Sequence, residues 1–110
     1  MRFQKVVQNI KAINQFVSEI NFDDCVFQIY APFFNVDIND VVEIQVSSAL
    51  LDSAEYRVCA TVYHVVDKTI FLSSGGLLAR ISAPHHQFQK GEEVYCTFTR
   101  RRSKRKHRIT

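Results

Sequence analysis

The sequence lacks an apolar run approaching the roughly 20 residues that a membrane-spanning helix needs. Its first residues also lack the apolar segment of a secretory signal peptide. No internal repeat is present, and low complexity is confined to the basic C-terminal end. These absences predict a single domain without a membrane segment, since 110 residues is an ordinary domain length.

Cysteine is scarce. Three cysteines, Cys25, Cys59 and Cys96, are odd in number and far apart, and each lies in a strand-like stretch. This spacing argues against a disulfide framework and predicts small buried side chains in a reducing compartment.

Basic charge is sparse outside the C-terminus. Seven of the fourteen basic residues lie in the last eleven positions: Arg100, Arg101, Arg102, Lys104, Arg105, Lys106 and Arg108. Residues 1–99 carry seven basic and eleven acidic residues, a formal charge of −4. We predict a folded domain, residues 1–102, whose first 99 residues form an acidic body, and a solvated, disordered basic tail, residues 103–110. Such a tail can serve as a targeting signal, a phosphate-contacting arm or a solubilising end.

The segment Arg2–Ile20 supports two structures. Its apolar residues recur at helical spacing, which favours an amphipathic helix. It is also rich in β-branched residues, which favour a strand, and it holds two asparagines before position 15, which are poor helix formers.

From Phe22 onward the pattern is that of β-strands. Tyr56, Val58, Ala60 and Val62 alternate with polar or smaller residues, a period of two that marks a half-buried strand. Asn39-Asp40, Gly75-Gly76 and Lys90-Gly91 provide turns. Strands separated by turns every eight to twelve residues indicate an all-β barrel or sandwich.

The sequence shows no convincing catalytic or metal-binding group. Ser73–Gly76 lacks the Gly-Lys-Ser/Thr ending of a phosphate loop and joins two strands. His85-His86 has no partner at zinc-finger spacing. The pairs Asp23-Asp24 and Glu92-Glu93 fit solvated turns or edges. Cys59 and His64, five residues apart in one strand, are expected on opposite faces, and therefore form no dyad.

Five stretches, in order, resemble the small subunit shared by the nuclear RNA polymerases I, II and III, the subunit 8 family: Phe3–Ala12, Phe22–Pro32, Asp40–Leu50, Tyr56–Ile81 and Val94–Arg101. The most specific is Gly75-Gly76-Leu-Leu-Ala-Arg-Ile, which resembles the family's Gly-Gly-Leu-Leu-Met-Arg-Leu. Relative to that family the chain would be a shortened form, because the family's first strand is missing or reduced here and its long loop shrinks to Leu51–Ala54.

The resemblance implies an OB-like antiparallel β-barrel of about seven to eight strands. It also implies that Arg2–Asn14 is extended, and we adopt this expectation over the helical spacing. The implied function is that of a non-catalytic assembly subunit in the nucleus, with no cofactor. Its partners would be the largest RNA polymerase subunit and other polymerase subunits.

The strand after the Gly-Gly turn supplies the candidate partner contacts, Gly75, Gly76, Leu78 and Arg80. Alternation places Leu77, Ala79 and Ile81 inside, so that Leu78 and Arg80 point outward and can contact a partner. In the alternative interpretation Leu78 packs under a loop and Arg80 is solvated. The two glycines either allow another backbone to approach or simply make the turn.

Two alternatives remain open. One is a free OB-type protein that binds single-stranded nucleic acid through its basic tail and strand aromatics: Phe27, Tyr30, Tyr56, Tyr63, Phe71 and Phe98. The other is a small enzyme accessory domain. The acidic body argues against the first, and for the polymerase subunit we expect at most weak electrostatic contact with nucleic acid.

Overall fold

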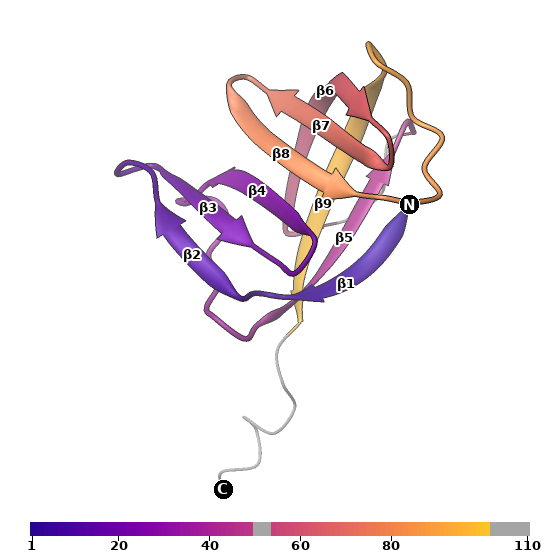
Figure 1. Ribbon diagram of the computed structural model, residues 1–110. Coiled ribbons are helices and arrows are strands. Elements are labelled where there is room, and N and C mark those ends of the chain that lie inside the picture. Colours follow the sequence, from indigo (N-terminus) through magenta and orange to yellow (C-terminus); the bar gives the residue numbers. More distant parts are fainter. Residues whose placement is uncertain (50–53, 102–110) are drawn as a thin grey trace, which may run out of the picture.

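The structure is a computed structural model that describes residues 1–49 and 54–101. Within these ranges it contains no helix, hence none that could cross a membrane. It holds nine β-strands (Figure 1): β1 Arg2–Val6, β2 Asn9–Ala12, β3 Val17–Asn21, β4 Cys25–Tyr30, β5 Val41–Ser47, β6 Tyr56–Val66, β7 Thr69–Ser74, β8 Leu77–Ser82 and β9 Glu93–Arg101. The all-β prediction is confirmed.

The strands form one antiparallel sheet in the order β1-β5-β9-β6-β7-β8-β4-β3-β2. The two edges of this sheet are consecutive in the chain and are joined by Val7 and Gln8. The sheet therefore curls into a barrel-like shape, in which β1 and β2 are the halves of one bent segment (Figure 1). The strand count exceeds the predicted seven to eight because this segment changes partner at its bend.

The bend between β1 and β2 is held by backbone hydrogen bonds. The Val7 amide donates to the Asp40 carbonyl at 2.9 Å, and the Asn39 amide donates to the Val7 carbonyl at 2.8 Å. Asn39 has a φ of 78°, a left-handed conformation that asparagine tolerates better than most residues. The predicted Asn39-Asp40 turn thus anchors the change of partner.

The N-terminal segment is extended, as the resemblance implied. The helical spacing misleads because β1 and β2 bury their residues against different neighbours, β5 and β3. Between β2 and β3 the Asn14 side chain accepts hydrogen bonds from the amides of Phe16 and Val17 at 2.8 and 2.9 Å. Asparagine commonly stabilises turns in this way.

The inner faces of the strands form one apolar core. Within it Phe27, Phe34, Tyr56 and Phe98 form an aromatic cluster, with ring centroids of contacting pairs 4.9 to 5.9 Å apart. The Tyr56 hydroxyl accepts a hydrogen bond from the Tyr30 amide at 3.1 Å. This bond satisfies the Tyr30 amide at the end of β4, outside the stretch Cys25–Phe27 that pairs with β8.

Candidate functional site

The Gly-Gly turn connects β7 to β8 directly. Ser74 and Leu77 are paired in register, so Gly75 and Gly76 form a two-residue hairpin loop. Their φ angles are 57° and 95°, and two positive values in succession are typical of the type I′ turn. A side chain added at either glycine would meet no atom within 4 Å. The backbone conformation is therefore sufficient to explain both glycines.

The strand that follows, β8, presents its two faces as the sequence predicted. Ile81 is buried, and Ala79 packs against the core. Leu78 is 44% exposed, and Arg80 is exposed on the outer surface. No carboxylate of the described residues lies within ion-pairing distance of Arg80.

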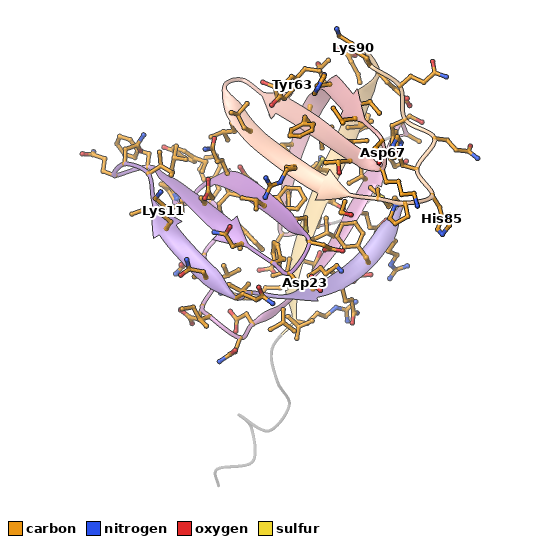
Figure 2. All side chains as sticks on the ribbon, viewed as in Figure 1. Lys11, Asp23, Tyr63, Asp67, His85 and Lys90 are labelled. Carbon is orange, nitrogen blue, oxygen red and sulfur yellow. The ribbon has the colours of Figure 1, made fainter. Side chains whose placement is uncertain are left out.

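Aromatic side chains continue this surface across β7 and β6. Arg80 is in register with Phe71, and Phe71 in turn is in register with His64. The Phe71 ring lies 5.5 Å from the His64 ring and 6.1 Å from the Tyr63 ring, between centroids. We call the surface formed by Tyr63, His64, Phe71, Leu78 and Arg80 the outer β6–β8 face; Tyr63 marks its β6 side in Figure 2.

A β-bulge in β6 builds part of this face. Val62 is in register with Leu72 and His64 with Phe71, so Tyr63 is an extra residue in β6. The bulge places both Tyr63 and His64 in exposed positions. It also corrects a prediction: Cys59 and His64 lie on the same face, because the extra residue shifts the alternation by one. No hydrogen bond between these two side chains is found in the described residues.

Two residues of the basic C-terminal cluster belong to β9. The Arg100 guanidinium donates to the Asn35 carbonyl, and the Arg100 amide donates to the Glu55 carboxylate. Arg101 forms an ion pair with Glu43. These contacts involve the barrel itself. The remaining cationic candidates, Arg102, Lys104, Arg105, Lys106 and Arg108, lie outside the described residues.

Glu43 is a buried carboxylate that lies between an arginine of β1 and an arginine of β9. Arg101 of β9 and Arg2 of β1 both bind it, and the Glu43 side chain is only 7% exposed. The hydrogen bond from Arg101, followed by that from Arg2, holds the pKa of Glu43 below its usual value. The three residues link β1, β5 and β9. The two arginines shield the Glu43 carboxylate from solvent on the outer face of the sheet.

The aromatic residues proposed to stack on nucleic-acid bases divide into two groups. Phe27, Tyr56 and Phe98 are buried in the core, whereas Tyr63 is exposed, and Tyr30 and Phe71 are half-buried. The buried three are not available to a ligand.

An exposed aromatic cluster was missed by the sequence reasoning. Phe33, which is 73% exposed, lies 4.8 Å from Tyr30, and Tyr30 lies 6.1 Å from Phe16, between ring centroids. A signal was present in the doublet Phe33-Phe34, because adjacent residues rarely point to the same side. Phe34 enters the core, which leaves Phe33 at the surface.

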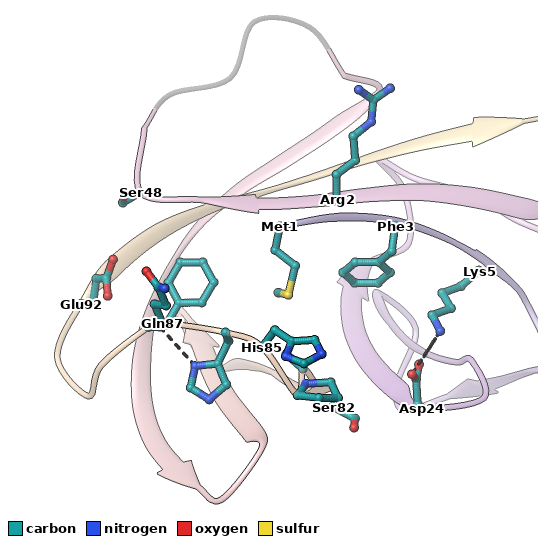
Figure 3. A pocket seen from close by; sticks show the side chains of 14 residues that line it. Met1, Arg2, Phe3, Lys5, Asp24, Ser48, Ser82, His85, Gln87 and Glu92 are labelled. Carbon is teal, nitrogen blue, oxygen red and sulfur yellow. Dashed lines mark hydrogen bonds and ion pairs between the residues drawn. The ribbon is translucent and has the colours of Figure 1, made fainter.

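A groove of about 790 Å³ lies between β1 and the connection from β8 to β9. Figure 3 shows Met1, Phe3 and Lys5 on one side, with Ser82, His85 and Asp24 across from them. Phe88 contributes a second aromatic ring, and its amide donates to His86 Nδ1 at 3.1 Å. The two adjacent histidines therefore line a groove.

An ion pair lies across one end of the groove. Lys5 Nζ lies 3.0 Å and 3.1 Å from the two carboxylate oxygens of Asp24 and 3.3 Å from Asp23. The hydrogen bond to Asp24 raises the pKa of Lys5 above its ordinary value, in spite of partial burial. The dashed line between Lys5 and Asp24 in Figure 3 marks this bridge from β1 to the β3–β4 turn.

The three cysteines lie at separate places in the sheet and form no disulfide. All three thiols are free. Cys25 and Cys96 are buried as predicted, but Cys59 is exposed, because it occupies the outer face of β6. Residues 1–49 and 54–101 contain no group of three or more side chains placed to hold a metal ion.

No protein-family model matches the chain, and no curated protein sequence matches it.

Proposed function

We propose that this protein is a non-catalytic assembly subunit of a DNA-directed RNA polymerase in the nucleus. On this proposal it is an OB-like barrel that docks on the largest subunit. Support comes from the five family-like stretches in their proper order and from the all-β, barrel-like sheet into which they fold. The Gly-Gly-Leu-Leu-Ala-Arg stretch, the most specific of the five, forms the hairpin and strand that border the outer β6–β8 face.

The observation that carries the docking proposal is the chemistry of the outer β6–β8 face. It combines an exposed leucine, two aromatic rings and an arginine for which no ion-pair partner is found in the described residues. Interfaces are enriched in aromatic residues and arginine and depleted in other charges. An enzyme site would instead need a nucleophile, an acid–base pair or a metal at this position, and the proposal assigns none.

The test is co-expression of the full chain with the largest polymerase subunit of its own source, followed by co-purification. The double variant Leu78→Asp with Arg80→Glu should fold but fail to co-purify. The matched control is Ile13→Asp with Lys11→Glu, which makes the same types of change at exposed positions in and directly after β2. The control should co-purify normally.

The result has three readings. If only the Leu78/Arg80 variant fails to assemble while its circular dichroism stays unchanged, the docking face is located. If both variants assemble, docking occurs elsewhere on the chain. If the unchanged chain does not co-purify with the polymerase subunit at all, the proposed function is wrong.

The alternative is a free OB-type protein that binds single-stranded nucleic acid. The exposed cluster of Phe16, Tyr30 and Phe33 favours it, because exposed aromatic rings are the usual platforms for base stacking. The formal charge of −4 over residues 1–99 argues against it. On this alternative, Phe33→Ala should weaken binding of a single-stranded oligonucleotide in a fluorescence titration at moderate salt, and Phe88→Ala should not.

A further inference from the structure

We propose that β1 binds an extended peptide of a partner protein along its free edge, as an added β-strand lying in the groove. This site is separate from the outer β6–β8 face and does not depend on which assembly the protein joins. The inference rests on three observations: an unpaired strand edge, a groove of matching size beside it, and an apolar floor flanked by charges.

The hydrogen-bonding pattern identifies the free edge. Met1 and Val46 exchange two backbone hydrogen bonds, at 2.9 and 2.8 Å. Because such pairs recur at every second residue of an antiparallel ladder, Phe3 and Lys5 also direct their backbone groups to β5. The amides and carbonyls of Arg2, Gln4 and Val6 must then point away from β5, and β1 has no other strand partner among the described residues.

Unpaired edges usually carry some protection against added strands, and Lys5 provides part of it here. The Lys5 side chain lies on the same strand face as Phe3 and bridges to Asp23 and Asp24, which closes one end of the groove. The segment from Met1 to Gln4 has no comparable cover. The available edge is therefore centred on Gln4, next to the open part of the groove.

The groove has the size and surface that a short peptide requires. Its volume of about 790 Å³ lies within the range of about 300–1,000 Å³ common for ligand sites. Phe3 and Phe88 are partly buried against the core and also line the groove, which gives it an apolar floor. Glu92 also lines the groove and is acidic, whereas the acidic Asp24 at the other end is already paired with Lys5.

These features define the peptide's chemistry. Backbone pairing with β1 supplies the binding energy, while alternate side chains meet the floor, as in other cases of strand addition. The peptide should therefore carry apolar residues at every second position and a basic residue at the end that meets Glu92.

The experiment uses the full chain labelled with ¹⁵N and the probe acetyl-Lys-Val-Thr-Val-Thr-Val-Lys-amide. Titration should give saturable amide shifts in β1 and in the 83–88 connection. Gln4→Pro removes the central outward N–H without removing a hydrogen bond to β5, and it should weaken probe binding about tenfold or more. Gln4→Ala, which keeps the N–H, should bind the probe as the unchanged protein does.

A second form of the probe tests the backbone pairing itself. N-methylation of the three valines in one probe and of the two threonines in another blocks opposite edges of the peptide. One probe should lose binding and the other should keep it. Equal binding of both, equal binding by Gln4→Pro, or an absence of shifts in β1 would overturn the proposal.

Self-association is the competing use of this edge. If size-exclusion chromatography with light scattering shows a dimer of the unchanged chain that Gln4→Pro abolishes, and the probe fails to bind, the occupant is a second copy and the peptide proposal is wrong. A monomer whose probe binding depends on the Gln4 amide supports the peptide.

Discussion

At the scale of single residues, Glu43 shows how a charged group can stabilise a sheet from its outer face. Arg101 and Arg2 cover it and hold its pKa below its usual value. We expect Glu43→Gln to lower the thermal midpoint at pH 7 by a few degrees. Glu93→Gln is the control, because Glu93 is exposed and forms no ion pair within the described residues.

The effect should depend on pH with a definite sign. A carboxylate whose pKa is lower in the folded state contributes stability above its unfolded pKa, near 4.5, and loses it as the pH falls through the folded value. The difference in midpoint between the unchanged protein and Glu43→Gln should therefore be constant from pH 8 to 6 and narrow below pH 4.5. A difference that grows on acidification would contradict this account.

Thiol reactivity should distinguish the three cysteines. Burial raises the pKa of Cys25 and of Cys96 to about 12, and only the thiolate reacts readily. Cys59 is exposed on β6. Ellman's reagent at pH 8 should therefore label one thiol rapidly in the native protein and three in denaturant. Cys59→Ser should abolish the rapid phase; rapid labelling of two or more native thiols would show that the core opens readily.

At the scale of strands and turns, local pattern predicted most of the molecule. The alternation in Tyr56–Val62 and in Leu77–Ile81 identified the inner faces of β6 and β8, because each strand has one buried and one outer side. The pattern failed at Tyr63, where a bulge adds a residue, and at Arg2–Ile20, where residues bury against two different neighbours. The bulge leaves no local signal, since it is decided by the partner strand. In Arg2–Ile20 the β-branched residues did indicate a strand, but the helical spacing of the apolar residues obscured it.

The Gly75-Gly76 turn offers a matched pair of substitutions. Gly76→Ala places a side chain at a φ of 95°, and we expect it to destabilise the protein by about 1–2 kcal/mol. Gly75→Asn should cost less than about 0.5 kcal/mol, because Asn-Gly is the preferred pair for this type of turn. Urea unfolding measures both changes. Equal effects would indicate that backbone conformation does not explain the glycines.

At the scale of the whole molecule, the candidate sites depend on contacts that the sequence does not reveal. Arg2, Glu43 and Arg101 are far apart in the chain yet join three strands. The groove likewise combines β1 with the connection after β8. Sequence reasoning identified Leu78 and Arg80 because both lie in one strand. It missed the groove because its two walls are brought together only when the sheet curls.

The basic C-terminus allows the boundary of the folded body to be tested. We expect removal of residues 103–110 to leave the thermal midpoint within about 2 °C of the full chain. The removed segment has Ile109 as its only aliphatic residue, so its removal takes away little apolar surface. Any weak binding of DNA or RNA should disappear with it, and in the full chain that binding should fall steeply as salt rises.

A slightly longer truncation provides the control. Ending the chain at Thr99 also removes Arg100 and Arg101, whose contacts with Glu55, Asn35 and Glu43 join β9 to the rest of the barrel. Because these contacts are lost together with the end of the β5–β9 pairing, this truncation should lower the midpoint clearly, as followed by circular dichroism. If both truncations leave the thermal midpoint unchanged, Arg100 and Arg101 do not stabilise the barrel and are to be counted with the basic C-terminal segment. If the chain without residues 103–110 still binds single-stranded nucleic acid tightly at moderate salt, the nucleic-acid-binding alternative gains over the polymerase subunit.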